Sequence, residues 1–505
     1  MKKARLTLCS EYKTGEVDRR VFGSFIEHLG RAVYGGIYEP SHPSADENGF
    51  RTDVSALIKE LGVPLVRYPG GNFVSGYNWE DGIGPVAERP RRLELAWGTT
   101  EPNTFGTDEF LHWCGTNGIE PLMAVNLGTR GADAARALVE YCNHPGGTYW
   151  SDLRKKNGTE QPYGVKLWCL GNEMDGTWQM GHKDATDYGK TAAEAAKLMK
   201  WTDPTVKTVL CGSSSYGMGT FGDWEATTLE IAYDHVDYIS MHQYHGNGDN
   251  DLPNFLAKGV ETEQYIQSVI AALDFVQGKR RTKKRIDISF DEWNVWYHSH
   301  GAEFEKWSEA PHILEDIYNF ADALVTATML NAILRHADRV KIACLAQLVN
   351  VIAPIMTENG GRAWKQTIYY PFCYASRCAG GSSLLLLTDC PTYETKRYGD
   401  VPVADCSAVL SGDGNELTVF AVNRDLKDSV LLETKLLAFE GFGSPVHLSM
   451  DGFSPDEINT ASRQTVQPKE RKAPAFDGKT LTAELPALSW NMIKLTKKNE
   501  TRRTS

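Results

Sequence analysis

The sequence predicts an α/β protein in which a (β/α)8 TIM barrel is joined to a C-terminal all-β sandwich. From about residue 20 to 345, short apolar runs alternate with longer stretches of helical period, which is the pattern of repeated βα units. After Pro371 the alternation gives way to short strand-like runs separated by Gly, Asp and Pro. The chain has 505 residues, of which 41% are hydrophobic and 23% charged, so it is globular and long enough for two domains.

Eight apolar runs are predicted to be the barrel strands. Between them, apolar residues recur at helical spacing, as in Val54, Leu57, Ile58 and Leu61, so one face of each helix can pack on the sheet. Eight such units in about 330 residues suit a TIM barrel with enlarged loops. The strand cores are 21–25, 64–67, 121–125, 165–170, 206–211, 238–241, 286–290 and 340–345.

The domain boundaries follow from the same change of pattern. We predict a catalytic barrel over 15–375 and a β-sandwich over 376–498, to which residues 1–14 also belong because the run 4–9 can supply a further strand. The polar segment 499–505 is predicted to be a frayed tail.

Charge and targeting signals limit the partners. A net charge of −12 argues against nucleic acid, because binding to phosphates needs clustered Lys and Arg. The basic run 279–285 is predicted to be a solvated loop. No apolar signal region and no stretch of about 20 apolar residues is present, so neither secretion nor membrane association is expected. The ten cysteines are scattered without a C-x-x-C pair, which indicates reduced thiols in a cytoplasmic protein.

Polar residues follow almost every predicted strand. In a TIM barrel the active site lies at the carboxyl ends of the strands, so these side chains are expected to converge on one cavity. They are Glu27, His28, Arg67, Asn72, Asn126, Asn172, Glu173, His242, Tyr244, Asp291, Glu292 and Gln347.

Two of these residues, Glu173 and Glu292, directly follow strongly apolar runs. A carboxyl group there is costly unless it is paired or used. Glycosidic cleavage needs two carboxyl groups, one protonated to release the leaving oxygen and one ionised to meet the anomeric carbon. The alternative is that either Glu only forms a salt bridge with Arg67. The amide-rich surroundings favour the catalytic pair.

Longer motifs carry a family resemblance. The chain resembles the α-L-arabinofuranosidases of glycoside hydrolase family 51 over essentially its whole length, and the combined motifs are highly specific. The matching stretches are GSFIEHLG (23–30), RYPGGNF (67–73), MAVNLGT (123–129), WCLGNEMDG (168–176), SFDEWNVW (289–296) and AQLVN (346–350).

The resemblance implies a retaining double displacement, with Glu173 as general acid/base and Glu292 as nucleophile. It also implies an exo-acting enzyme that releases terminal arabinofuranose from arabino-oligosaccharides, and a homo-oligomer, either a hexamer or a trimer of dimers. The residues that it implies for binding the furanose are Glu27, Asn72, Asn172, Tyr244, Gln347 and Trp296.

The chemistry of the neighbouring residues fits these roles. Arg67 and Tyr244 can hold Glu292 ionised, while Glu173 is less well compensated and remains the acid. His242 is expected to orient Tyr244 or Glu292. The supporting residues Trp97 and Trp178 lie in loops near the barrel mouth, where they either pack on a sugar ring or fill space.

No metal or cofactor is predicted. His242 and His245, with His298 and His300 downstream, do not form the H-E-x-x-H pattern of a zinc site, and no glycine motif for a nucleotide or flavin is present. The segment 299–311 is shorter than the resemblance leads one to expect, so the preference for a leaving group stays open.

Three rival functions remain. The nearest is another retaining barrel glycosidase, such as a β-xylosidase or an endo-glucanase. The others are a non-catalytic carbohydrate-binding protein, against which the two glutamates speak, and a metal-dependent barrel isomerase.

Overall fold

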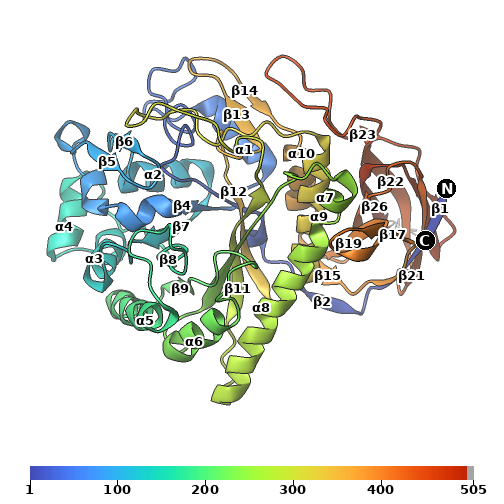
Figure 1. Cartoon of the computed structure of the whole chain (residues 1–505), viewed down its shortest axis with the longest axis horizontal. Helices are drawn as coiled ribbons and strands as arrows, with labels where there is room; N and C mark the ends of the chain where they lie inside the picture. The colour runs from blue at the N-terminus through green and yellow to red at the C-terminus, as the bar shows by residue number, and fades with distance from the viewer. Residues whose placement is uncertain (498–505) are drawn as a thin grey trace, which may run out of the picture.

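The computed structural model describes residues 1–497, and the tail predicted at 499–505 lies outside the described residues. Within this range eight parallel strands close into a barrel in chain order (Figure 1). Every one of the eight predicted strands is present, so the TIM barrel is confirmed. The strands are β3 (Gly23–Phe25), β4 (Leu65–Tyr68), β7 (Glu120–Val125), β8 (Leu167–Leu170), β9 (Lys207–Leu210), β10 (Tyr238–His245), β11 (Asp287–Val295) and β12 (Val340–Ala346).

Helices surround the barrel. In α1, Val54, Ile58 and Leu61 are buried against the sheet, and Gly62 ends the helix in the left-handed conformation that glycine adopts without strain. The helices are α1 (Thr52–Leu61), α2 (Thr107–Asn117), α3 (Ala132–Asn143), α4 (Tyr149–Lys156), α5 (Ala185–Thr202), α6 (Asp223–Ala232), α7 (Leu252–Leu256), α8 (Gly259–Arg280), α9 (Phe320–Arg335) and α10 (Tyr369–Cys378).

The second domain consists of a five-stranded and a seven-stranded sheet that enclose their own apolar core. The first sheet contains β16 (Leu387–Asp389), β1 (Lys2–Cys9), β21 (Val430–Leu437), β25 (Thr480–Leu485) and β24 (Ala475–Phe476). The second contains β2 (Lys13–Glu16), β15 (Gly381–Leu384), β19 (Ala404–Ser411), β20 (Glu416–Asn423), β26 (Ser489–Lys497), β22 (Phe442–Met450) and β23 (Lys469–Glu470).

The N-terminal run supplies a strand to this domain, as predicted. β1 pairs in parallel with β21, and Leu6 and Leu8 point into the sandwich core. The two ends of the described chain therefore meet on the β domain (Figure 1). β2 spans the boundary predicted at 14/15, and α10 spans the one predicted at 375/376.

Three short hairpins complete the described strands. They are β5 (Arg92–Glu94) with β6 (Thr99–Glu101), β13 (Ile355–Thr357) with β14 (Ala363–Lys365), and β17 (Thr392–Thr395) with β18 (Gly399–Pro402). The first lies in the loop after β4 and carries Trp97 at its tip.

Helix α9 joins the two domains. All its residues from Phe320 to Leu334 are buried, because it packs on the barrel strand β11 on one side and on β19 and β20 of the β domain on the other. A helix that is apolar all round is what such a doubly covered position requires.

One prediction about a polar segment is revised. Lys279 and Arg280, predicted to lie in a loop, form the last turn of α8 and pair with Glu230 and Asp234 of α6. The helix extends further because these ion pairs support its end.

Along residues 1–497, no helix has both the length and the apolar character of a membrane span.

The strands that carry the site also run further than predicted. β11 has one more residue than either neighbour between Phe290 and Glu292, since the register shifts against both β10 and β12 there. This bulge turns both Asp291 and Glu292 toward Arg67, with nitrogen-to-oxygen distances of 3.7 Å and 2.6 Å. Bulges often re-aim side chains beside active sites.

Candidate active site

A cavity of about 440 Å³ opens at the carboxyl ends of the barrel strands. It is of the size that binds small ligands. Nine residues singled out in the sequence line it, namely Glu27, Asn72, Trp97, Glu173, Trp178, Tyr244, Glu292, Trp296 and Gln347. The lining residues that sequence reasoning missed are Phe25, Leu29, Gly71, Ser214, Ser215, Leu314 and Ile352. Of the other predicted site residues, Arg67, Asn172 and His242 are buried and bond directly to the lining side chains.

Glu292 is held by two donors. Arg67 Nη1 donates to its Oε1 at 2.6 Å, and the Tyr244 hydroxyl donates to its Oε2 at 2.8 Å. The two bonds hold the carboxyl group in one orientation. The backbone of Gly71 passes so close that a Cβ there would lie 2.9 Å from Glu292 Oε1, so this position needs glycine.

Glu173 stands on a tight turn after β8. Gly171 and Glu173 itself have positive φ angles of 89° and 44°. A non-glycine residue in that region is strained, and such strain collects at functional sites. The carboxyl group accepts from Trp178 Nε1 at 2.7 Å and bonds to His242 Nδ1 at 3.0 Å.

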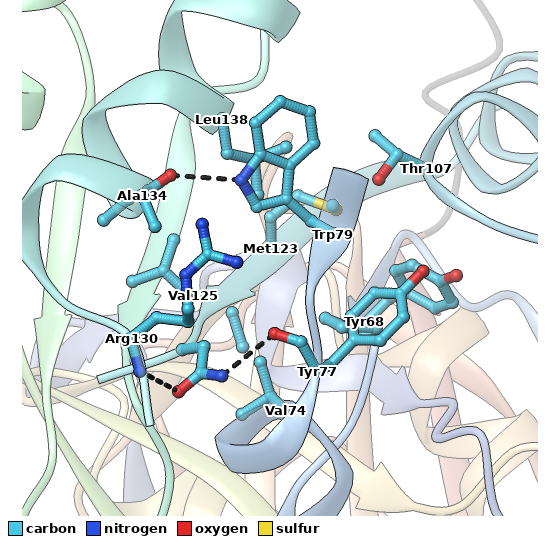
Figure 2. A pocket seen from close by; sticks show the side chains of 14 residues that line it. Tyr68, Val74, Tyr77, Trp79, Thr107, Met123, Val125, Arg130, Ala134 and Leu138 are labelled. Carbon is cyan, nitrogen blue, oxygen red and sulfur yellow. Dashed lines mark hydrogen bonds between the residues drawn. The ribbon is translucent and has the colours of Figure 1, made fainter. Parts of the chain in front are cut away.

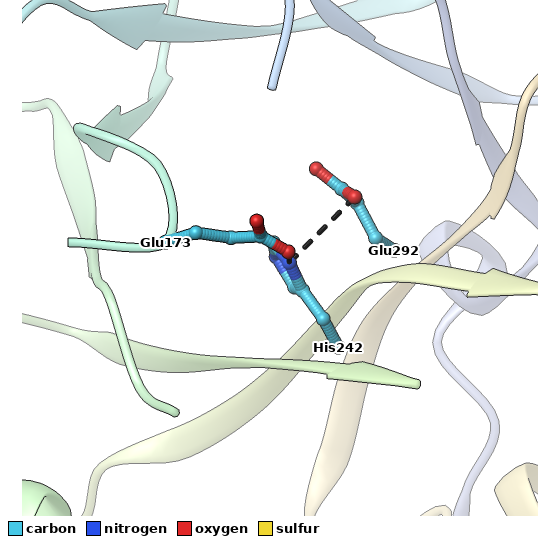
Figure 3. Close-up of side chains that lie close together, drawn as sticks. All are labelled: Glu173, His242 and Glu292. Atoms are coloured by element: carbon cyan, nitrogen blue, oxygen red, sulfur yellow. Dashed lines mark hydrogen bonds and ion pairs between the residues drawn. The ribbon is translucent and has the colours of Figure 1, made fainter. Parts of the chain in front are cut away.

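The two carboxyl groups face each other across the cavity. Figure 3 shows Glu173 and Glu292 pointing toward one another from opposite sides, with the His242 ring beside them. One oxygen of each carboxyl group and one nitrogen of His242 all lie within 4.8 Å of one another.

His242 lies between Glu173 and Asp291 and bonds to both. Its Nδ1 bonds to Glu173 and its Nε2 to Asp291 Oδ1, each at 3.0 Å, whereas Glu292 Oε2 is 3.6 Å away. Burial lowers the pKa of His242, but the charge of Glu292 and the bonds to Asp291 and Glu173 outweigh it and raise the pKa to about 10. The prediction that His242 orients Tyr244 or Glu292 is therefore corrected, because its hydrogen bonds go to Glu173 and Asp291.

Asp291 is one of the predicted strand-end residues, but the sequence reasoning gave it no role in the site. It is fully buried, and although burial opposes ionisation, Arg67 and His242 outweigh it and lower the pKa of Asp291. It thus balances the charge of both cations. Its place beside Glu292 in the DEWN motif was the available signal, but strict strand alternation predicts that one of two neighbours points away.

Glu27 lines the opposite wall. Its Oε1 accepts from Phe73 N–H at 2.8 Å and from Trp97 Nε1 at 3.1 Å, and its own N–H donates to Gln347 Oε1 at 2.9 Å. Burial raises the pKa of Glu27 to about 8, and the nearby charge of Glu292 adds to the effect. At neutral pH this carboxyl group is protonated and can both donate and accept a hydrogen bond.

The amides and the third tryptophan complete the lining. Asn172 Oδ1 accepts from Arg67 Nη2 at 2.8 Å, and Asn172 Nδ2 lies 3.4 Å from Asn72 Oδ1. The Trp296 ring packs edge-on against Tyr244 with 5.6 Å between centroids. The cavity therefore presents fixed donors and acceptors at several angles, together with apolar ring faces.

The sequence reasoning also did not identify Asp175, a carboxyl group behind the turn that carries Glu173. Asp175 accepts from the backbone N–H and hydroxyl of Ser214 at 3.0 and 3.3 Å, and burial raises the pKa of Asp175 to about 6. It ties the Glu173 turn to the loop after β9. Its position two residues after Glu173 in the GNEMDG motif was the only signal in the sequence.

A second cavity lies beneath the loop after β4 (Figure 2). Its walls are largely apolar, with Tyr68, Trp79 and Leu138 around it, and Trp79 Nε1 donates to the Ala134 carbonyl. Its volume of about 20 Å³ holds one water molecule at most. It is too small to bind a substrate.

The other histidines considered as ligands have separate partners. His245 Nε2 bonds to Thr262 Oγ1 at 2.9 Å, His298 Nε2 bonds to Asp322 at 2.7 Å, and the His300 ring packs edge-on against Trp296. In residues 1–497, the His, Cys, Asp and Glu side chains close enough to share an ion are those of Glu173, His242 and Glu292. His242 Nδ1 already pairs with both carboxyl groups, at 3.0 Å from Glu173 Oε1 and 3.6 Å from Glu292 Oε2.

Comparison with known proteins relates this geometry to a family. Residues 57–258 match the model of the α-L-arabinofuranosidase 1 domain, and residues 291–489 match that of the α-L-arabinofuranosidase C-terminal domain.

Full-length relatives agree with the domain matches. The chain is 57% identical to the intracellular exo-α-(1→5)-L-arabinofuranosidase 1 of Bacillus subtilis, covering 99% of this chain and 100% of that protein. It is 47% identical to an exo-α-(1→6)-L-arabinofuranosidase of Bifidobacterium longum, covering 98% and 97%. The solved structure of a family 51 α-L-arabinofuranosidase from Bifidobacterium longum superposes with a TM-score of 0.93 at 44% identity, covering 98% and 99%. The protein belongs to the α-L-arabinofuranosidases of glycoside hydrolase family 51.

Proposed function

We propose that the protein is a retaining, exo-acting enzyme that releases terminal non-reducing arabinofuranose from arabino-oligosaccharides. The observation that carries the proposal is the opposed pair Glu173 and Glu292, whose nearest oxygens lie within 4.8 Å. Retaining glycosidases hold their carboxyl groups about 5 to 5.5 Å apart, whereas inverting enzymes need roughly 6.5 to 9.5 Å to admit a water. The short separation supports retention.

The nucleophile in this proposal is Glu292. Its carboxylate attacks the anomeric carbon while the bond to the leaving oxygen breaks and Glu173 gives its proton to that oxygen. Glu173 then takes a proton from water, which attacks the same carbon and releases the sugar from Glu292. Arg67 and Tyr244 hold Glu292 through two hydrogen bonds, and His242 and Trp178 fix the direction of Glu173.

The substrate is assigned from the lining of the cavity. The carboxyl group of Glu27 and the amides of Asn72, Asn172 and Gln347 offer the donors and acceptors that several ring hydroxyls require. A site built to bond hydroxyls rejects sugars that lack them. The limited cavity volume of about 440 Å³, which suits one terminal sugar, supports attack on chain ends.

Linkage and location follow from the relatives. The more similar relative is named for (1→5) linkages and the less similar one for (1→6), so we assign α-(1→5)-arabino-oligosaccharides as the preferred class. The word intracellular in the first name supports a cytoplasmic enzyme that acts on imported fragments.

Proton NMR of the first sugar released from a set of arabino-oligosaccharides tests the proposal. We expect α-arabinofuranose to appear first and to convert to the β anomer later, with the (1→5) trisaccharide cleaved faster than (1→6) compounds. Initial release of the β anomer would refute retention, and internal fragments would refute exo action. A strong preference for aryl β-xylopyranoside would refute the substrate.

The proposal also includes assembly. The family resemblance supports a homo-oligomer, either a hexamer or a trimer of dimers. Sedimentation velocity should then give about six times the 56.1 kDa mass of the chain. A single monomeric species at micromolar concentration would contradict this part of the proposal and leave the catalytic part intact.

A further inference from the structure

The segment 451–468 of the β domain, here called the arm, lies beside the first turn of α9. It connects β22 and β23 and forms the long loop near the β23 label in Figure 1. Ala321 N–H donates to the Pro455 carbonyl at 3.0 Å, and Asn319 forms an antiparallel bridge with Ile458. The rings of Phe453 on the arm and Phe320 on α9 pack edge-on with centroids 5.4 Å apart. The arm therefore fixes the start of α9.

The buried carboxyl group of Asp322 lies at the start of α9, where it bonds to both Asn319 and His298. Asn319 caps α9, accepting from Asp322 N–H at 3.0 Å, and its own N–H donates to Asp322 Oδ2 at 2.8 Å. Asp322 is fully buried. The same oxygen bonds to His298 Nε2 at 2.7 Å, so the helix cap and His298 share one acceptor.

His298 belongs to the wall of the active site. This wall, residues 296–318, begins with Trp296 and includes Leu314, and both line the cavity. The backbone N–H groups of Tyr297, His298 and Ser299 all donate to Asp316, at 3.0, 3.0 and 2.8 Å. The position of His298 thus constrains the residues directly after Trp296.

His298 and Asp322 form a short hydrogen bond in the protein interior. Burial opposes a charge on the imidazole, but the bond to Asp322 and its negative charge outweigh it and raise the pKa of His298. Burial also raises the pKa of Asp322, although the bond from His298 partly offsets the effect. Without His298, the buried carboxyl group would keep only the Asn319 N–H at 2.8 Å and the Tyr297 hydroxyl at 3.3 Å as donors, and the loss of one partner in the interior carries a cost.

We infer that His298 is a positioning residue for substrate recognition and that, through Asp322 and Asn319, the arm of the β domain holds the Trp296 wall in place. This gives the β domain a part in the active site, although none of its residues lines the cavity. The inference rests on the proposed function, because Trp296 is taken to contact the sugar.

Kinetics of His298 variants test the link. His298→Ala should raise KM for arabinotriose about five- to tenfold, the loss expected for one hydrogen bond, while kcat stays within about twofold. His298→Gln, whose amide can still donate to Asp322, should recover most of the loss. The matched control is His312→Ala, on the same wall but 68% exposed and bonded to Glu315, which should behave as wild type.

Hydrogen exchange provides a readout that does not depend on activity. Phe453→Ala should speed amide exchange in residues 296–299 and 319–322, whereas Arg463→Ala, an exposed position on the same arm, should not. Unchanged exchange in Phe453→Ala together with unchanged KM in His298→Ala would overturn the inference. If the wild-type protein did not cleave arabinofuranosides, the proposed function would be overturned instead. The hydrogen-exchange result would still show whether the arm holds the Trp296 wall in place.

Discussion

Arg67 Nη1 lies 2.6 Å from Glu292 Oε1, and both side chains are almost completely buried. The same guanidinium donates through Nη2 to Asn172. Lysine keeps the charge but has a single nitrogen and cannot bond both partners in this geometry. We therefore expect Arg67→Lys to lower kcat/KM on an aryl arabinofuranoside about 100-fold or more, equivalent to about 3 kcal/mol.

The matched control is Arg20→Lys. Arg20 pairs with Glu120 at the opposite end of the barrel, at 2.6 Å, so the chemistry of the substitution is the same. Thermal unfolding of both variants separates lost stability from lost catalysis. Near-wild-type turnover in Arg67→Lys would show that this contact is only structural.

Glu292→Ala should abolish turnover, because it removes the carboxylate that attacks the anomeric carbon in the proposed mechanism. With an activated aryl substrate, added azide should restore transfer and give the glycosyl azide of inverted configuration, because a small anion fills the vacated space. Mass spectrometry and NMR identify the product. Rates close to wild type without azide would remove Glu292 from the nucleophile role.

Glu173→Ala should affect substrates according to their leaving groups. Arabino-oligosaccharides, which need protonation of the leaving oxygen, should lose about 100- to 10,000-fold, whereas a dinitrophenyl arabinofuranoside should lose much less. Trp178→Phe removes only the 2.7 Å bond to Glu173 and should give a milder version of the same pattern. Equal losses on both substrate types would argue against an acid role.

Most of the barrel, and the positions of Glu173 and Glu292 at the cavity, could be predicted because the information is local. Each strand is a short apolar run, and Glu173 and Glu292 come at the ends of such runs, where the fold places the site. Because both residues carry carboxyl groups, they favour a reaction that uses a pair of them, such as glycosidic cleavage. The same reasoning found Arg67, since a buried cation at a strand end needs acid partners.

The rest of the site depends on contacts between distant segments. Leu314 and Ile352 lie in loops without periodic pattern, and Ile352 N–H bonds to the Leu314 carbonyl at 2.7 Å. The bulge that turns Asp291 inward is a register shift against two neighbouring strands, which no single strand encodes. The arm at 451–468 likewise gains its meaning only from its contact with α9.

Chelation should leave the activity unchanged. Glu173, His242 and Glu292 have the residue types of a metal site, but the pKa of His242 is raised to about 10, so the imidazole carries both protons and donates rather than coordinates. Overnight dialysis against EDTA should preserve kcat on an aryl arabinofuranoside, with a known zinc hydrolase as positive control. Loss of activity that zinc restores would contradict the proposed mechanism.

Glu27→Gln should make the protein more stable than wild type at alkaline pH. Burial raises the pKa of Glu27 to about 8, against about 4.5 for the free side chain. Between these values the native state holds a proton that the unfolded chain has released, so wild-type stability falls by about 1 kcal/mol per pH unit through this group. Glutamine does not titrate, and it keeps an acceptor for Phe73 and Trp97 and a donor for the cavity. The difference in unfolding free energy between variant and wild type should therefore grow from pH 5 to pH 8 and level off above it. Denaturant unfolding across this pH range measures the difference in unfolding free energy. The control is Glu47→Gln, which removes an exposed carboxyl group and should show no such trend. A constant difference would mean that Glu27 is already ionised in the native state at pH 5.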